Sequence, residues 1–153
     1  MRIRHLAIVL AAAAVVSTGC NREVRFAGPS ETGQTVITEV LTGTVAPPVN
    51  AVRQVTFKTY TVGQGGGPVE ITLTSAVLTR PDGSVLTTVQ MGLGAGTPVD
   101  GACVVPVGAY VVTTPGNSPQ LAGNLTAGTY CVQLSDVTNQ VGPVAFSITV
   151  THT

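Results

Sequence analysis

The chain has 153 residues, so one small domain is expected once any leader is set aside. Hydrophobic residues make up 44% of the sequence, charged residues only 9% and aromatic residues 4%, a composition that argues against a disordered chain. The formal net charge is zero and the Lys and Arg residues are scattered, which excludes the basic patch that nucleic-acid binding requires.

Residues 1–19 are typical of a bacterial export signal. Arg2 and Arg4 make the start positive, and residues 6–16 form an unbroken apolar run. This run fits the ~7–15 residues of a signal-peptide core and is shorter than the ~20 that a membrane span needs. Small residues at 17–19 then supply a cleavage site. We therefore expect residues 1–19 to be a helical signal peptide, with an uncleaved helix as the alternative.

The junction at residues 16–20 (VSTGC) resembles the lipobox of bacterial lipoproteins, although Ser17 stands where Leu is usual. The resemblance implies that Cys20 carries a lipid anchor and becomes the first residue of the mature chain. Asn21 then implies the outer membrane in a Gram-negative host, or the outer face of the plasma membrane in a Gram-positive one. The same small residues would also suit ordinary secretory cleavage, so a secreted protein stays open.

Three cysteines in an exported protein leave one unpaired thiol. If Cys20 is lipidated, Cys103 and Cys131 remain as a pair in an oxidising compartment, where disulfides persist. We expect them to form a disulfide, with Cys131 outside the deep core. The rival interpretation is a metal-binding or reactive thiol pair, but neither a CxxC motif nor a histidine accompanies these two cysteines.

Turn residues divide the rest of the chain into short apolar segments. Residues 20–34 are polar and read as a flexible tether, and residues 35–153 as one domain. Strands are expected at 35–45, 51–62, 69–79, 84–91, 129–136 and 144–151, with a β-prone segment at 103–114, a Gly-rich loop at 92–101 and irregular structure at 115–127. These elements predict an all-β, two-sheet sandwich of seven or eight strands.

Strict alternation predicts which side chains face the core. In 69–79 the expected inward face includes Ser75 and Val77. The other inward residues are Val69, Ile71 and Leu73 in the same strand, Tyr130, Val132 and Leu134 in 129–136, and Val144, Phe146, Ile148 and Val150 in the last strand.

Several segments resemble bacterial pre-peptidase C-terminal (PPC)-like domains. Residues 121–132 (LAGNLTAGTYCV), Asp136 and 145–150 (AFSITV) are similar to the C-terminal half of that family, and 55–57 and 67–73 to its early strands. The resemblance implies a jelly-roll-like sandwich that serves as an accessory module of exported hydrolases, some members binding calcium or an extracellular polymer. We expect no attached enzyme domain here, and the sequence has no run of acidic residues like that of the calcium-binding members. Neither calcium binding nor polymer binding is therefore assigned to this chain.

Candidate catalytic groups are few. His152 could act as a base, but we expect it to lie in a frayed chain terminus without a catalytic role. Asp100 and Asp136 suit turns and Glu70 a solvent-exposed strand face, although together they could bind calcium. The Gly-rich stretches 63–67 and 92–96 lack the Lys-Ser/Thr ending of a P-loop and open no helix.

Carbohydrate binding often uses aromatic platforms, for which this chain offers only Tyr60, Tyr110 and Tyr130. We therefore assign no catalytic residue, metal or cofactor. The sequence predicts a membrane-anchored lipoprotein that displays a non-enzymatic structural or binding module to an unknown extracytoplasmic protein or polymer. The alternatives are a calcium-dependent adhesion or polymer-binding module, and an exported hydrolase with an unrecognised site.

Overall fold

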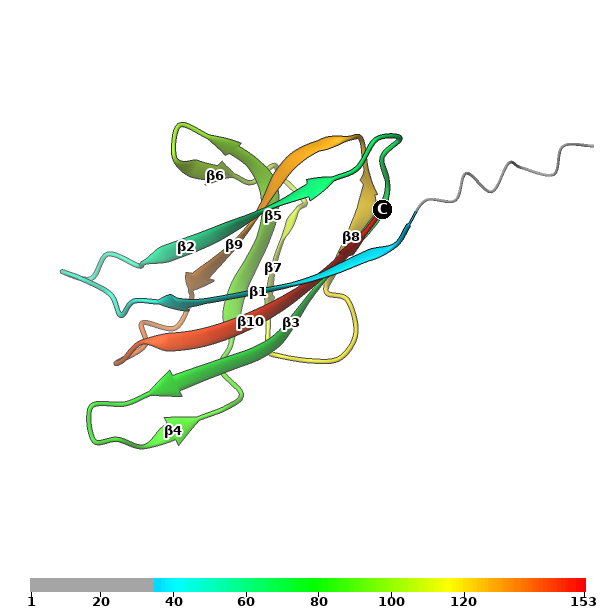
Figure 1. The fold of residues 1–153 in the computed structure, drawn as a ribbon. Coiled ribbons are helices and arrows are strands. Elements are labelled where there is room, and N and C mark those ends of the chain that lie inside the picture. Colours follow the sequence, from blue (N-terminus) through cyan, green and yellow to red (C-terminus); the bar gives the residue numbers. More distant parts are fainter. Residues whose placement is uncertain (1–34) are drawn as a thin grey trace, which may run out of the picture. The chain divides into compact units, whose positions relative to one another are not determined.

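Two antiparallel sheets face each other in the computed structural model, which describes residues 35–153 (Figure 1). The first sheet has the order β1 (Ile37–Val45), β10 (Val144–His152), β3 (Gly67–Thr79), with β4 (Val85–Leu86) and β8 (Leu121–Leu125) both beside β3. The second has the order β2 (Val55–Val62), β9 (Gly128–Asp136), β5 (Met91–Val99), with β6 (Ala102–Val104) and β7 (Tyr110–Thr113) both beside β5. The predicted two-sheet sandwich is confirmed, with ten strands rather than seven or eight.

The core lies between the sheets and follows the predicted alternation over most of its length. In β10 and β9 the expected apolar side chains face inward, and Leu134 and Val150 are fully buried. In β3 the prediction is wrong beyond Leu73. The register with β10 shifts there, so that Ala76 rather than Ser75 enters the core. A bulge inserts one extra residue into a strand, which exchanges the inward and outward faces beyond it.

The Gly-rich segment expected to be a loop at 92–101 is instead mostly strand β5, paired with β9 on one side and with β7 and β6 on the other. Its glycines allow close packing. A Cβ on Gly92 would clash with the side chains of Tyr110 and Ser135, and one on Gly96 with the carbonyl oxygen of Val104. Glycine inside a strand often marks such a close approach.

The segment 115–127, expected to be irregular, contains β8, which pairs with the first residues of β3. The predicted hairpin after residue 79 is present, but its second strand, β4, has only two residues. Its turn is closed by the Gly83 amide, which donates to the Arg80 carbonyl, and by the Asp82 carboxylate, which accepts from the Ser84 amide.

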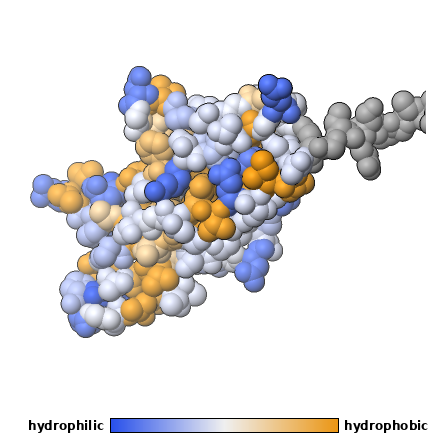
Figure 2. Space-filling model, in the orientation of Figure 1, coloured by the Kyte–Doolittle hydropathy of each residue, from blue (hydrophilic) through white to orange (hydrophobic). Residues whose placement is uncertain are grey.

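The surface has little charge, in keeping with the composition. Figure 2 shows a mostly pale face on which separate apolar patches alternate with a few strongly polar side chains. Within residues 35–153, no helix is long and apolar enough to cross a membrane.

Candidate functional site

A pocket of about 370 Å³ opens between the two sheets. Its first wall is formed by the beginning of β3, at Val69 and Ile71, and by β8. The opposite wall comes from the second sheet, including Ala95 on β5 and the aromatic side chains of Tyr60 and Tyr130. Its volume lies in the range of ~300–1,000 Å³ that is usual for small-molecule sites.

Small residues create this space. On β8, Leu121 and Leu125 pack against the core, and Gly123 lies between them on the same side of the strand. A Cβ at Gly123 would meet no atom within 4 Å. Opposite, Ala95 and Ala109 line the pocket where larger side chains would fill it.

Hydrogen bonds hold both walls in place. The Ala95 amide donates to the Ala109 carbonyl (2.9 Å), which attaches the segment before β7 to β5. On the other wall, the Gln120 side-chain oxygen accepts from the Leu73 amide (2.7 Å), and the Gln120 amide donates to the Ile71 carbonyl (3.0 Å). These bonds extend the attachment of β8 to β3 beyond the strand itself.

The lining contributed by residues 35–153 contains no charged side chain. The Tyr130 hydroxyl donates to the Thr126 carbonyl (3.0 Å). Tyr60 is only 3% exposed, and its hydroxyl has no hydrogen-bond partner among the described residues. Burial, together with the nearby Tyr130, raises the pKa of Tyr60 to about 12, so this phenol is uncharged at neutral pH.

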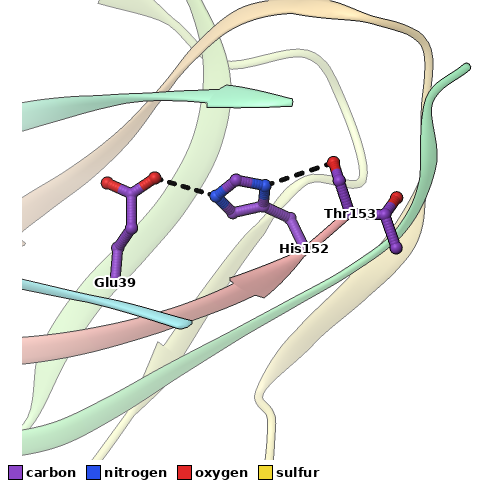
Figure 3. Close-up of polar contacts among 3 residues, drawn as sticks. All are labelled: Glu39, His152 and Thr153. Carbon is purple, nitrogen blue, oxygen red and sulfur yellow. Dashed lines mark hydrogen bonds and ion pairs between the residues drawn. The ribbon is translucent and has the colours of Figure 1, made fainter. Parts of the chain in front are cut away.

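His152 lies against the Tyr60 ring, with ring centroids 5.7 Å apart. Its Nε2 is 2.8 Å from a Glu39 carboxylate oxygen and its Nδ1 is 3.3 Å from the Thr153 carbonyl oxygen (Figure 3). The expected frayed histidine is wrong, because β10 continues to His152, which pairs with Ile37 and is 1% exposed. Both partners accept hydrogen bonds, so the ring donates to both only when it is protonated. This geometry joins β1 to β10.

The three tyrosines do not form an exposed aromatic platform. Tyr60 and Tyr130 lie with their ring centroids 6.0 Å apart, but Tyr60 is buried. Tyr110, on β7, places its hydroxyl 3.2 Å from that of Ser135 instead. Tyr130 is partly buried against the core, as its alternation predicted.

The acidic candidates stay apart. The Asp136 carboxylate accepts from the amides of Thr138 and Gln140 (2.9 Å each), and Asp100 lies in the β5–β6 turn with φ of 48°. The turn roles expected for these two residues are therefore confirmed, and Glu70 is exposed as expected. Within residues 35–153, no group of three His, Cys, Asp or Glu side chains could hold a metal ion.

The predicted disulfide between Cys103 and Cys131 is confirmed, with Cα atoms 5.9 Å apart. Strands separated by one other strand in a flat sheet lie ~10 Å apart. The β5–β6 hairpin must therefore curl over the outer face of the second sheet, where Phe57 and Gln133 lie beneath it. Cys131 lies on this outer face and outside the core cluster between the sheets, as expected, but it is 0% exposed because the hairpin covers it. Cys20 lies outside the described residues.

Compared with known proteins, the chain matches no family model and no curated sequence. The likeness to PPC-like domains and to lipoprotein signal peptides therefore stays a prediction. Sequence reasoning missed the pocket, whose best signal is the alternation of Leu121, Gly123 and Leu125 inside a segment expected to be irregular.

Proposed function

We propose that residues 35–153 are a non-enzymatic binding module whose pocket holds a small, uncharged and mostly apolar molecule. The observation that carries this proposal is the pocket of about 370 Å³ between the sheets, lined mostly by apolar side chains and by no charged one among the described residues. A ligand charge buried there without a partner would cost several kcal/mol, whereas apolar surface gains ~25 cal/mol per Å² removed from water.

The size of the pocket limits the ligand. Its volume equals that of about twelve waters in the liquid, so a compact molecule of on the order of ten to fifteen non-hydrogen atoms fits. The absence of a nucleophile paired with a base in the described lining supports binding rather than catalysis. His152 is already engaged by Glu39 and is not part of the pocket lining.

The module is held at the cell envelope by a lipid on Cys20. The lipobox-like junction and the odd number of cysteines support this part of the proposal, and the Cys103–Cys131 disulfide suits an oxidising compartment. Intact mass measured on protein extracted from membranes tests it. A chain beginning at Cys20 with the added mass of acyl groups is expected, and an unmodified chain in the soluble fraction would contradict it.

Titration with the small neutral fluorophore 1-aminonaphthalene, whose size is within this limit, tests the pocket. We expect saturable binding of one probe molecule with enhanced emission. Gly123→Leu should abolish it, because the new side chain enters open space at an ordinary backbone conformation. Asn124→Leu adds the same side chain one residue later, on the exposed outer face of β8, and should bind like the wild type.

Thermal melts of both variants show that they fold. Equal loss of probe binding in the two variants, or unchanged binding in Gly123→Leu, would contradict the assignment of the pocket.

A further inference from the structure

The free edge of β1 differs from every other free edge among residues 35–153. Each sheet ends on its other side in short strands of two to five residues, namely β4 and β8 in the first sheet and β6 and β7 in the second. The edge strand β2 carries Lys58. β1 has nine residues, no Lys, Arg or Pro, and no register shift against β10. Proteins usually protect a free edge by short strands, Lys, Pro, bulges or inward-pointing charges, and of these β1 has only the last, in Glu39.

Two hydrogen bonds identify which backbone groups point outward from β1. The Thr44 carbonyl accepts from the Thr56 hydroxyl of β2 (2.9 Å), on the side away from β10. The carbonyl of Ser147, the β10 residue opposite Thr42, accepts from the Thr74 hydroxyl of β3 (3.1 Å), so it points away from β1. Thr42 and Thr44 are therefore not backbone-bonded to β10.

Outward and inward backbone groups alternate along an antiparallel strand, since the N–H and C=O of one residue point to the same side. Thr38, Val40 and Thr42 thus direct both groups to the free edge. Their side chains are all exposed, and Val40 is 63% exposed. In Figure 2 separate apolar patches, with polar side chains between them, lie along the line where Figure 1 draws β1.

We propose that β1 pairs antiparallel with β1 of a second copy of this chain, about a two-fold axis at Val40. On the exposed face the residues around the axis read Thr38, Val40, Thr42, which is symmetric. The pairing places Val40 opposite Val40 of the second copy and Thr38 opposite Thr42 of the second copy. Thr–Thr and β-branched pairs stabilise adjacent strands, and the symmetry satisfies the same backbone groups in both copies.

Charge is compatible with this register. Glu39, the charged residue of β1, lies on the inner side and contacts His152. In the proposed register it faces Leu41 of the second copy, so no like charges lie directly opposite each other. The two five-stranded first sheets then join into one continuous sheet across the axis.

Sedimentation of the purified full chain in detergent tests the proposal. A mass of two chains is expected for the wild type, and a mass of one chain for Val40→Lys, which places two ammonium groups together. Val40→Pro should also be monomeric yet fold, because the N–H it removes points to the free edge. Leu41→Pro removes an N–H that bonds to β10 and should destabilise the fold itself.

Disulfide crosslinking tests the register. Val40→Cys should crosslink two copies under mild oxidation, since directly opposed hydrogen-bonded residues have Cα atoms ~5.5 Å apart. Thr38→Cys adds the same thiol but is expected ~14 Å from its counterpart, so it should crosslink no more than the wild type. A monomer at ~100 µM, or equal crosslinking by the two variants, would overturn the proposal.

Discussion

Replacing Tyr60 by Phe removes one oxygen atom and leaves the packed ring in place. The hydroxyl is buried and has no partner among residues 35–153. A buried, unpaired hydroxyl costs ~1–3 kcal/mol. We expect the lower end, because the adjacent pocket lets the ring adjust. Tyr60→Phe should therefore raise the free energy of unfolding by about 1 kcal/mol, which corresponds to about 4 °C in melting temperature for a domain of this size.

Tyr130→Phe is the matched control, because it removes the same atom from a hydroxyl that donates to the Thr126 carbonyl. It should lower the free energy of unfolding by about 0.5–1 kcal/mol. Urea unfolding of both variants and the wild type at pH 7 provides the measurement. If Tyr60→Phe destabilises the protein as much as Tyr130→Phe, the Tyr60 hydroxyl has a partner in solution and the argument is refuted.

The same substitution changes the response to alkaline pH. The pKa of Tyr60 is raised from 10.0 to about 12 by burial and by the neighbouring Tyr130. Between these values the unfolded chain has lost a proton that the folded protein keeps, so the free energy of unfolding falls as the pH rises. The loss approaches about 2–3 kcal/mol at pH 12 in the wild type. Tyr60→Phe should not show this loss of stability. If the free energy of unfolding falls with pH in parallel for the wild type and the variant, the prediction is contradicted.

Three further outcomes follow from the contacts described above. Cys103→Ala with Cys131→Ala should lower the free energy of unfolding by about 3–4 kcal/mol, because the disulfide closes a loop of 28 positions, and a loss below about 1 kcal/mol in non-reducing urea would disprove this. His152→Ala should lower the free energy of unfolding by about 3 kcal/mol, whereas Glu39→Gln keeps an acceptor and should lower it by about 1 kcal/mol. Equal effects of the two variants in urea unfolding would count against the contact between these side chains. Residues 35–153 alone should give a β-type circular dichroism spectrum and a cooperative melt without added metal, whereas a disordered spectrum would show that the core needs more of the chain.

Strands with strict alternation were predictable from the sequence. In β9 and β10 each apolar residue occupies the face that its spacing indicates, because one face of each strand packs against the core. The prediction failed in β3 where the register with β10 shifts. A bulge is a property of two paired strands, so the alternation of β3 by itself carried no sign of it.

Glycine caused the other failures in the fold. The glycines of β5 resemble those of a loop until their close neighbours, Tyr110 and Val104, are known. Likewise, β8 contains Gly123 and only two large apolar residues, which is too little pattern for a confident strand.

The candidate site was harder to predict than the fold. A pocket is space that side chains leave unfilled, and this one depends on small residues in three separate segments, including Ala95, Ala109 and Gly123. The role of His152 depends on Glu39, which lies 113 positions earlier in the chain. By contrast, the disulfide was predictable, since three cysteines and the expected export to an oxidising compartment left few pairings.

The disulfide has a topological consequence for the pocket. The bond between Cys103 and Cys131 closes a covalent ring that contains β7, β8, the segment with Ala109, and Tyr130. Much of the pocket lining therefore belongs to this ring. A protease that cuts once between residues 103 and 131 opens the ring but releases no fragment, so a nicked molecule stays in one piece until its disulfide is reduced.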